Sequence, residues 1–410
     1  MNVDLNQNIE HLFRNEYGKV VSLLTNRYGI SYLEKIEDSV QDTFLKAMQV
    51  WGYQSIPDNP TGWLYRVANN AVIDQFRRGK KVNYSDNPQK IDKGVLDKEM
   101  TTENEISDSQ LKMIFACCHP SLSEEHQIIL SLKLIGGFSN KELAEALLKK
   151  EETVAKSFTR AKKKFKKEVQ LLQIPVQMGL QSRLFVVLRV IYLLFSEGYA
   201  TTTGSQVLKK DICYEALRLA LLLNGNPYCQ HKNLDALIAL MCFHASRFDA
   251  RLDKKGDMVS LKFQDRSKYD KRLIDYGVYH LKKAGNKKNS LSNYHFEAAI
   301  SLYHCSASSF KATDWASILQ LYDIQLKRQR SPIVALNRII AFSKVHGAEK
   351  ALIALEDVEK TSDYTANGLY YAIKAELLAK TGKTHNAVLQ KALAFTDNEL
   401  MKKHLIKKLG

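Results

Sequence analysis

"EETVAKSFTRAKKKFKK", residues 151–167, is acidic in its first two positions and strongly basic after them. Val154, Phe158, Ala161 and Phe165 recur at helical spacing, so the stretch predicts a helix with one apolar side. Seven of its last twelve residues are Lys or Arg, and they face away from that side. A cationic helix face on its own is more often solvated than bound to a partner, so the neighbouring sequence has to decide.

A second helix pattern lies directly upstream, in FSNKELAEALLKK at 138–150. Ser139 followed three residues later by Glu142 is typical of a capped helix start. Its predicted buried positions are Leu143, Ala144 and Leu147. Only a few residues separate this helix from the basic one, so we predict a helix-turn-helix, although the turn lacks the glycine often found there.

The second helix of such a pair can enter the major groove of DNA, with its first turns facing base edges and its flanks facing phosphates. The predicted DNA-binding residues are Thr153, Lys156, Ser157, Thr159, Arg160, Lys163 and Lys164. We expect Lys162, Lys166 and Lys167 to add salt-sensitive attraction to phosphates.

The composition limits the number of domains, the kind of partner and the cellular location to be expected. The chain has 410 residues, 45% of them hydrophobic, and a formal net charge of +16, which is enough for two or three domains and favours an anionic partner. The six cysteines form no regular framework, and the first residues lack the pattern of a secretion signal. The apolar stretch 184–195 is interrupted by Arg189 and is too short to span a bilayer. The sequence therefore predicts a cytoplasmic protein without a membrane span.

Helical periodicity recurs almost throughout and strand signals are nearly absent, so we predict an all-α fold. Its expected parts are a helical domain at 8–79, a flexible linker at 80–107, a second domain at 108–172 and a helical extension at 177–410. In the first domain, a helix at 37–52 should bury Val40, Phe44, Ala47, Met48 and Trp51. The following helix should turn Leu64, Val67, Ala68 and Ala71 inward.

Taken in order, these parts resemble the two-domain RNA polymerase sigma factors of the extracytoplasmic function (ECF) type, in the sigma-70 family. EDSVQDTFLKAMQVW (37–51) resembles region 2.2, and NPTGWLYRVANNAVIDQFRR (59–78) resembles regions 2.3 and 2.4. LSEEHQIILSLKLIGGFSNKELAEAL (122–147) and the basic helix after it resemble region 4. The match covers roughly residues 8–170.

The resemblance implies three functional surfaces. Binding to core RNA polymerase is expected from Asp38, Gln41, Asp42 and Lys46. Melting and reading of the −10 promoter element is expected from Asn59, Thr61, Trp63, Asn69, Asn70, Asp74, Arg77 and Arg78. The basic helix is expected to read the −35 element. Opening DNA needs polar or aromatic pockets for separated bases, which these residue types can supply, although a tryptophan beside Leu64 is more often part of a core.

The rest of the chain resembles a subgroup of these sigma factors with a large extension related to tetratricopeptide repeats. The similarity rests on LFSEGYATTTG (194–204), SPIVALNRIIAFSKVHGAEKALIALE (331–356) and CCHPSLSEE (117–125). The second stretch predicts two packed helices with a turn at Gly347, and residues 368–396 repeat the theme. We expect this extension to contact the sigma domains and to regulate or support them.

Two other classes of protein remain as alternatives. A stand-alone helix-turn-helix regulator with a C-terminal sensor domain would bind duplex DNA by itself, but it has no use for the first domain. A metal enzyme is suggested only by adjacent Cys and His residues at 117–120, 229–231, 242–244 and 304–305. None of these groups has ligand spacing, and no nucleophile elbow or phosphate loop occurs. The sequence therefore predicts no enzyme, no cofactor and no metal site.

Overall fold

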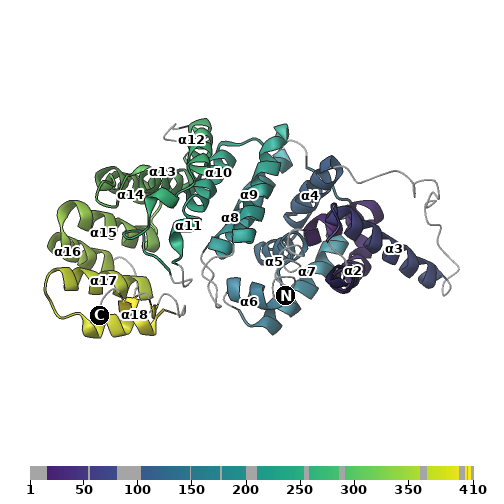
Figure 1. Ribbon diagram of the computed structural model, residues 1–410, viewed down its shortest axis with the longest axis horizontal. Helices are drawn as coiled ribbons and strands as arrows, with labels where there is room; N and C mark the ends of the chain where they lie inside the picture. Colours follow the sequence, from purple (N-terminus) through teal and green to yellow (C-terminus); the bar gives the residue numbers. More distant parts are fainter. Residues whose placement is uncertain are drawn as a thin grey trace. The chain divides into compact units, whose positions relative to one another are not determined.

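The computed structural model describes residues 16–53, 56–80, 103–147, 149–175, 178–199, 210–253, 258–285, 291–360, 367–396, 402–403 and 405–407. Within these residues the regular secondary structure consists of helices (Figure 1). The single β-bridge, between Leu252 and Met258, is isolated. The predicted all-α fold is confirmed. The predicted linker lies mostly at 81–102, outside the described residues.

The chain divides into two compact units. Unit 1 contains Met1–Leu194 and Tyr214–Cys229, and unit 2 contains Phe195–Cys213 and Gln230–Gly410. The helices in and around unit 1 are 16–28, η1 (Ile30–Tyr32), α2 (Leu33–Tyr53), α3 (Pro60–Lys80), α4 (Glu103–Cys117), α5 (Glu124–Leu134), α6 (Asn140–Ala146), α7 (Glu151–Glu168), α8 (Met178–Tyr199), α9 (Lys210–Gly225) and η3 (Pro227–Cys229). Those of unit 2 are α10 (Lys232–Ala245), α11 (Phe248–Arg251), η4 (Arg266–Lys268), α12 (Lys271–Ala284), α13 (Asn293–Ser306), α14 (Trp315–Arg328), α15 (Pro332–His346), α16 (Ala348–Glu359), α17 (Gly368–Lys380) and α18 (Asn386–Ala394).

Unit 1 is built around two helix pairs. Helices α2 and α3 pack against each other, and α7 packs on both α5 and α6. The helix 16–28 joins the pairs, because Gly18 lies against the backbone of Ile135 at the end of α5. A Cβ added at Gly18 would lie 2.1 Å from the carbonyl oxygen of Ile135, so only glycine permits this approach.

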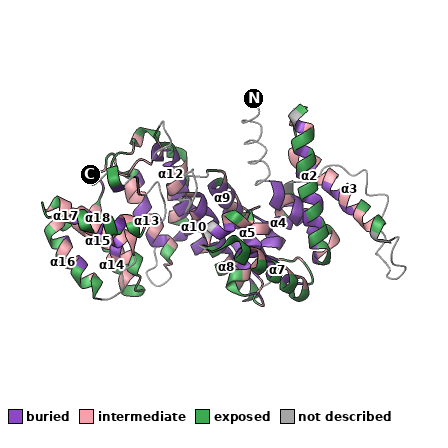
Figure 2. Ribbon diagram, turned by 90° about the horizontal axis from the view of Figure 1, so that it is seen from below, coloured by how far each residue is buried: buried purple, intermediate pink, exposed green. Residues whose placement is uncertain are grey.

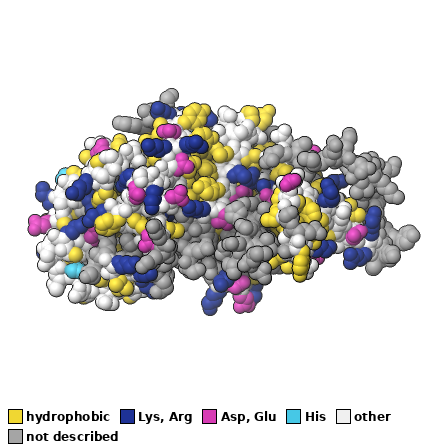
Figure 3. Space-filling view, viewed as in Figure 1, with side chains coloured by type: hydrophobic (Ala, Val, Ile, Leu, Met, Phe, Trp, Pro, Cys, Tyr) yellow, Lys and Arg dark blue, Asp and Glu magenta, His cyan; other side chains and the backbone are white. Residues whose placement is uncertain are grey.

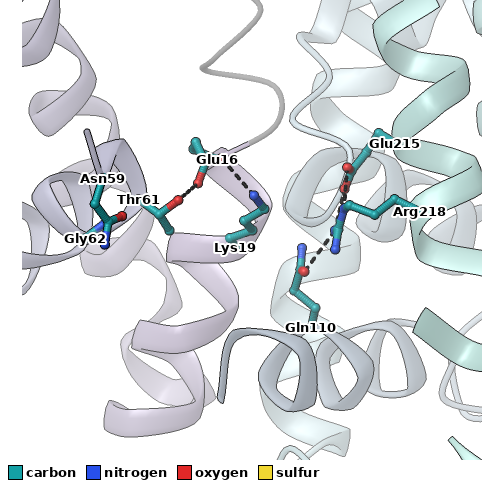
Figure 4. Close-up of polar contacts among 8 residues, drawn as sticks. All are labelled: Glu16, Lys19, Asn59, Thr61, Gly62, Gln110, Glu215 and Arg218. Carbon is teal, nitrogen blue, oxygen red and sulfur yellow. Dashed lines mark hydrogen bonds and ion pairs between the residues drawn. The ribbon is translucent and has the colours of Figure 1, made fainter. Parts of the chain in front are cut away.

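The first part of the predicted extension lies within unit 1. Arg218 of α9 donates to the side-chain oxygen of Gln110 in α4 at 2.9 Å and also pairs with Glu215 at 2.8 Å (Figure 4). Arg183 of α8 donates to the carbonyl of Phe115 at 3.4 Å. The division into units therefore does not follow the predicted domain limit near residue 177, because these helices share contacts with α4.

Helix α8 is both long and apolar. By length and composition alone, Gly179–Tyr199 could cross a bilayer, with a mean hydropathy of 1.4. Val187, Leu188 and Ile191 are buried in the protein, and core helices of soluble proteins satisfy the same criterion.

Unit 2 places consecutive helices next to each other. Nearly all of α10 is buried, and it packs on α12 and α13. From α13 to α18 each helix packs on the next, which is the neighbour-to-neighbour pattern of helical-hairpin arrays. Gly347, at φ 89°, forms the predicted turn between α15 and α16 in a conformation that favours glycine.

One buried cluster joins helices α15, α16 and α17. Leu336 and Ile339 of α15 lie with Ala351 and Leu355 of α16 in one cluster. Tyr370, Ile373 and Leu377 of α17 complete it. The two packed helices predicted around Gly347 are confirmed, since the residues expected to face inward include the centre of this cluster.

Candidate nucleic-acid interface

Helix α7 separates its apolar and polar residues as predicted. Val154, Phe158, Ala161 and Phe165 are buried. The predicted DNA-binding residues Thr153, Lys156, Thr159, Arg160, Lys163 and Lys164 are all exposed. Their spacing of three and four residues keeps most of them on one side of the helix. The structure thus brings these side chains together on an outward-facing surface, which we call the α7 face.

Two of the lysines expected to attract phosphate do not lie on the α7 face. Lys162 forms an ion pair with Glu37 of α2 at 2.9 Å, and both side chains are largely buried. Lys166 forms a second ion pair with Glu34, at 3.1 Å. These lysines connect α7 to the helix that resembles region 2.2. The expectation that they would contact phosphate in this conformation is wrong, because carboxylates of α2 occupy their ammonium groups.

The Glu37 carboxylate lies in a largely apolar setting. Burial raises its pKa, although the positive charge of Lys162 opposes the rise. Lys162 and Lys133 both approach the ring of Phe158, with ammonium nitrogens 4.6 and 5.3 Å from its centre. Burial also raises the pKa of Tyr17, whose hydroxyl adjoins Glu37 and Gln41. Tyr17, Glu37 and Lys162 therefore connect the helix 16–28, α2 and α7, and Lys133 adds α5 to the group.

The start of α6 confirms the capping pattern of the sequence. The Glu142 amide donates to the Ser139 hydroxyl at 3.2 Å, and the Ser139 amide donates to the Glu142 carboxylate at 2.9 Å. Leu143 and Ala144 are buried as expected, whereas Leu147 is half-buried. The helix-turn-helix pair is therefore fixed by α6, its cap and the apolar side of α7.

Some residues of the α7 face already have partners within the chain. Lys156 pairs with Glu152 at 2.6 Å, and the Thr159 hydroxyl donates to the carbonyl of Ala155. Ser157 is only half-buried, and its hydroxyl donates to Glu125 of α5 at 3.0 Å. Ser157 therefore lies at the edge of the face, where it ties α7 to α5.

Helix α2 exposes the residues predicted to bind polymerase. Asp38, Gln41, Asp42 and Lys46 are all exposed. Figure 2 shows that α2 as a whole has both exposed and buried positions along its length. Met48 was expected to be buried, but it is 43% exposed, so that prediction is wrong. Leu45 is exposed beside it at 59%. The predicted apolar stripe included Met48 at its edge, whereas Leu45 was assigned to neither side of the helix.

The beginning of α3 is held by polar contacts. The Asn59 side chain accepts a hydrogen bond from the Gly62 amide at 2.9 Å and so caps the helix (Figure 4). The Thr61 hydroxyl donates to Glu16, which also pairs with Lys19. Asn59 and Thr61, predicted to meet the −10 element, thus have structural roles in this conformation.

Trp63 lies between a core and a surface position. It is half-buried, and its ring centre lies 5.1 Å from that of the buried Trp51. The two rings are inclined by 57°, which is a favourable tilted contact. Trp63 therefore helps to pack α3 on α2 and also keeps an accessible edge.

Of the predicted DNA-binding residues in the remainder of α3, one is buried and the others are exposed. Asn69 is 8% exposed, and its side-chain oxygen accepts a hydrogen bond from the Tyr28 hydroxyl at 2.6 Å. Asn70, Asp74, Arg77 and Arg78 are exposed. Arg77 and Asp74 form a loose ion pair at 3.5 Å. The exposed members share the outer side of α3, and Asn69 does not join them.

The cysteine and histidine pairs show no metal-binding geometry in the described part of the chain, where no cluster of three ligands occurs. All six cysteines are buried and make no disulfide. Burial raises the pKa of the Cys118 thiol to about 12 and that of Cys229 to about 11, so these thiols stay protonated. They act as small core residues.

Three known families match successive parts of the chain. Residues 12–82 match Sigma-70 region 2, residues 112–165 match Sigma-70 region 4, and residues 183–285 match a family of unknown function (DUF6596). An uncharacterised protein of Rhizobium meliloti (strain 1021) is 31% identical over 375 residues, which cover 89% of this chain and 87% of that protein. RNA polymerase sigma factor YlaC of Bacillus subtilis (strain 168) is 27% identical over 146 residues, 34% of this chain and 79% of YlaC. No solved structure matches the chain.

These matches agree with the geometry of both sigma-like parts. The region 4 match ends within α7, and the region 2 match spans α2 and α3. A stand-alone regulator is not favoured, because region 2 would have no role in it. Sigma factors are not enzymes, and they act as soluble cytoplasmic proteins with core RNA polymerase and promoter DNA as partners. The chain belongs to the sigma-70 family, as a promoter-recognising sigma factor with a region 4 of the ECF type and a DUF6596 segment in its C-terminal part.

Proposed function

We propose that the α7 face reads the −35 element while the outer side of α3 meets the −10 element. The observation that carries this assignment is the division of α7, whose apolar residues are buried and whose cations are exposed together. Arg160 is the central residue of the face, because its guanidinium can bind a guanine edge through two hydrogen bonds. Lys163 and Lys164 follow it as phosphate contacts.

On α3 the exposed residues Asn70, Asp74, Arg77 and Arg78 meet the promoter directly. Asn69 acts instead as a positioning residue, since its hydrogen bond with Tyr28 holds α3 on the helix 16–28. Asn59 and Thr61 fix the start of α3, and Trp63 offers its accessible edge to a separated base. The set thus contains contact residues and residues that orient them.

The exposed side of α2 binds core RNA polymerase. Asp38, Gln41, Asp42 and Lys46 supply polar contacts, and Leu45 and Met48 add an apolar centre. Interfaces commonly combine a buried apolar centre with a polar rim, and this surface offers both. Leu45 and Met48 are therefore added to the residues predicted from sequence.

The C-terminal extension supports the sigma domains and regulates them, and the whole protein works in the cytoplasm without enzymatic activity. Arg218 with Gln110 and Arg183 with Phe115 support this role, because they join α9 and α8 to α4. The helical hairpins of unit 2 resemble tetratricopeptide repeats, which commonly present a surface for a peptide or a neighbouring domain.

The test separates the two surfaces on the full-length protein. Arg160→Ala should weaken promoter binding by the polymerase complex about 10- to 100-fold while binding to core stays unchanged. Asp42→Ala should weaken binding to core and leave the promoter preference of the assembled complex intact. Both are measured by binding of labelled promoter DNA and by co-elution with core polymerase.

Arg330→Ala, an exposed change in unit 2, is the matched control and should affect neither binding step. Equal losses of both activities in Arg160→Ala and Asp42→Ala would contradict the assignment of separate surfaces. Lys163→Met should lower the dependence of DNA binding on salt concentration by about one in the logarithmic slope. An unchanged slope would remove Lys163 from the phosphate contacts.

Arg218→Met tests the role of the extension without truncating the chain. A chain that ended near Pro175 would lose helices α8 and α9 from unit 1, so its behaviour would report on folding. If α9 supports the sigma domains, Arg218→Met should lower the melting temperature of unit 1 and reduce promoter-dependent transcription. Normal stability together with normal transcription would count against this support.

A further inference from the structure

Unit 2 contains a group of basic side chains that the sigma function does not use. Arg247 precedes α11, Arg251 ends that helix, and Arg266 begins η4. Arg247 and Arg251 are each 7% exposed, and Arg266 is half-buried. His244 of α10 and His304 of α13 are near enough for the arginine charges to lower their pKa values. We call Arg247, Arg251 and Arg266 the arginine cluster.

The arginine cluster makes no ion pair in the described part of the chain. Arg247 donates to the Tyr199 hydroxyl at 2.6 Å and lies 2.9 Å from the Nδ1 atom of His244. Arg251 donates to the Tyr199 carbonyl at 2.7 Å, and its guanidinium lies over the Tyr199 ring at 3.7 Å. All these acceptors are neutral, so among the described residues no carboxylate pairs with the two buried guanidinium groups.

Arg266 is in the same situation. It donates to the hydroxyl of Tyr269, which in turn donates to Gln264 at 2.8 Å. The carboxylate next to it in sequence, Asp265, accepts hydrogen bonds from Ser267 instead. Asp249, between the other two arginines in the chain, is exposed and pairs with Lys210 at 2.5 Å. These two carboxylates therefore have partners outside the arginine cluster.

Several buried N–H groups of the cluster have no acceptor among the residues that the structure describes. They are the Nε atom of Arg247 and the Nε and Nη2 atoms of Arg266. The Nδ1 atom of His304 is also buried without a partner. Buried polar groups in native proteins nearly always have a partner, and a buried cation is costly without a counter-charge. Unused donors on separate elements therefore indicate a missing acceptor with negative charge.

The histidines leave the positive charge with the arginines. Burial, followed by the charges of Arg247 and Arg266, lowers the pKa of His304 to about 4. Burial also holds the pKa of His244 well below its ordinary value. Both rings are therefore neutral near pH 7, and His304 can offer one N–H as a hydrogen-bond donor.

We propose that the arginine cluster, with His304, is a binding site for the phosphoryl group of a small molecule or for free phosphate. Guanidinium forks match phosphate oxygens in pairs, and a phosphate has enough acceptors for donors from several directions. A dianion offsets the charge of the cluster better than a single carboxylate does. The site joins residues from α10, α11, η4 and α13, so its ligand stabilises the fold of unit 2. This proposal is independent of the promoter and polymerase surfaces.

The cluster is not a simple surface patch. In Figure 3 the exposed Lys and Arg side chains on the visible face occur in separate groups with Asp and Glu among them. Arg247 and Arg251 differ from them in their burial and in having only neutral partners. Non-specific attraction of anions to a basic protein would be distributed over the surface, whereas this site should saturate.

The experiment measures the melting temperature of the full-length protein in phosphate-free chloride buffer while inorganic phosphate is added at constant ionic strength. A ligand that binds only the folded state should raise the melting temperature of unit 2 by about 5 °C at one hundred times its dissociation constant. Calorimetric titrations with inorganic phosphate, pyrophosphate and adenosine diphosphate then distinguish free phosphate from a phosphorylated small molecule. Acetate serves as the monoanionic comparison.

Arg247→Met and Arg266→Gln should each reduce phosphate affinity at least tenfold. Without phosphate, Arg247→Met should melt no lower than the unaltered protein, because it removes an unpaired buried charge. Arg338→Met, which removes an arginine already paired with Asp323 at 2.5 Å, should keep the full phosphate response.

Three results would overturn the proposal. One is a melting temperature that phosphate, pyrophosphate and adenosine diphosphate all leave unchanged. Another is an undiminished response in Arg266→Gln, which is half-exposed and is the safer variant if Arg247→Met does not fold. The third is acetate binding as tightly as the phosphates, which would assign the site to carboxylates.

Discussion

Buried cationic side chains have different partners in the two units. In unit 1, Lys162 of α7 is largely buried, and Glu37 of α2 provides its counter-charge at 2.9 Å. In unit 2, Arg247 and Arg251 are buried more deeply, and their partners among the described residues are Tyr199 and His244. Unit 1 therefore neutralises its buried cation within the chain, whereas unit 2 leaves that task to a ligand.

The difference shows how paired and unpaired buried charges affect stability. A paired charge fixes one arrangement of helices, since removing either partner leaves the other buried alone. An unpaired charge makes stability depend on what is bound. The Glu37–Lys162 pair thus fixes how α2 packs on α7, and the arginine cluster makes the stability of unit 2 depend on a bound ligand.

The largest expected effect comes from removing one partner of the pair. Lys162→Met should destabilise unit 1 by about 3 to 5 kcal/mol, because Glu37 would stay buried without a counter-charge. Urea unfolding followed by tryptophan fluorescence measures this effect, since Trp51 and Trp63 both belong to unit 1. The signal of Trp315 is removed by Trp315→Phe in every variant compared.

The matched control is Lys163→Met, which changes the adjacent exposed lysine and should alter stability by less than about 0.5 kcal/mol. Replacing both partners, Glu37→Gln with Lys162→Met, should restore much of the loss. Equal stability of the Lys162→Met and Lys163→Met proteins would show that the pair does not hold α2 on α7.

Acid should affect the two units in opposite directions. His304 has its pKa lowered from 6.5 to about 4, so the folded state binds fewer protons than the unfolded state between these values. Above pH 6.5 the free energy of unfolding of unit 2 does not depend on the titration of His304. As the pH falls below 6.5 this free energy decreases, by on the order of 3 kcal/mol at pH 4. Glu37 has a raised pKa, so its contribution increases as the pH falls from that raised pKa toward 4.5.

Denaturant unfolding at several pH values in phosphate-free buffer checks both signs. His304→Phe should reduce the loss of stability that unit 2 shows in acid. Glu37→Gln should remove the gain of stability that unit 1 shows as the pH falls. His346→Gln, a change of an exposed histidine, is the control. An identical pH profile for the His304→Phe and unaltered proteins would contradict the role assigned to burial and the two arginines.

The smallest expected effect concerns helix caps, which both units contain. Ser139→Ala removes the cap of α6, and Asp270→Ala removes the cap of α12, where the Asp270 carboxylate accepts from the Leu273 amide at 3.1 Å. Each should cost about 1 kcal/mol in the free energy of unfolding of its own unit. A large difference between the two would mean that the units differ in more than their buried charges.

Local patterns were sufficient to predict α7 and α6. The spacing of Val154, Phe158, Ala161 and Phe165 defines the buried side, and Ser139 with Glu142 defines the helix start. Both signals lie within a few turns of chain. Met48 was misplaced because a position at the edge of an apolar stripe can face either way, and only the packed neighbours decide.

Contacts between distant residues could not be predicted in this way. Helical spacing places Lys162 nearer to the apolar stripe than Lys163, but nothing in the sequence indicates that its partner is Glu37, 125 positions away. Asn69 and Asn70 are likewise neighbours, and only Asn69 is buried against Tyr28. The arginine cluster has residues from separate elements and no motif, so only the fold reveals it.

The contact of Glu37 with Lys162 also fixes an order of events during synthesis. The two residues are 125 positions apart in the chain, and Gly18 lies against Ile135 over a similar span. At a translation rate of about 5–20 residues per second, Glu37 is synthesised roughly 6–25 seconds before its partner lysine. During that interval Glu37 has no Lys162 to meet, so the nascent first domain is complete in sequence before it is complete in structure.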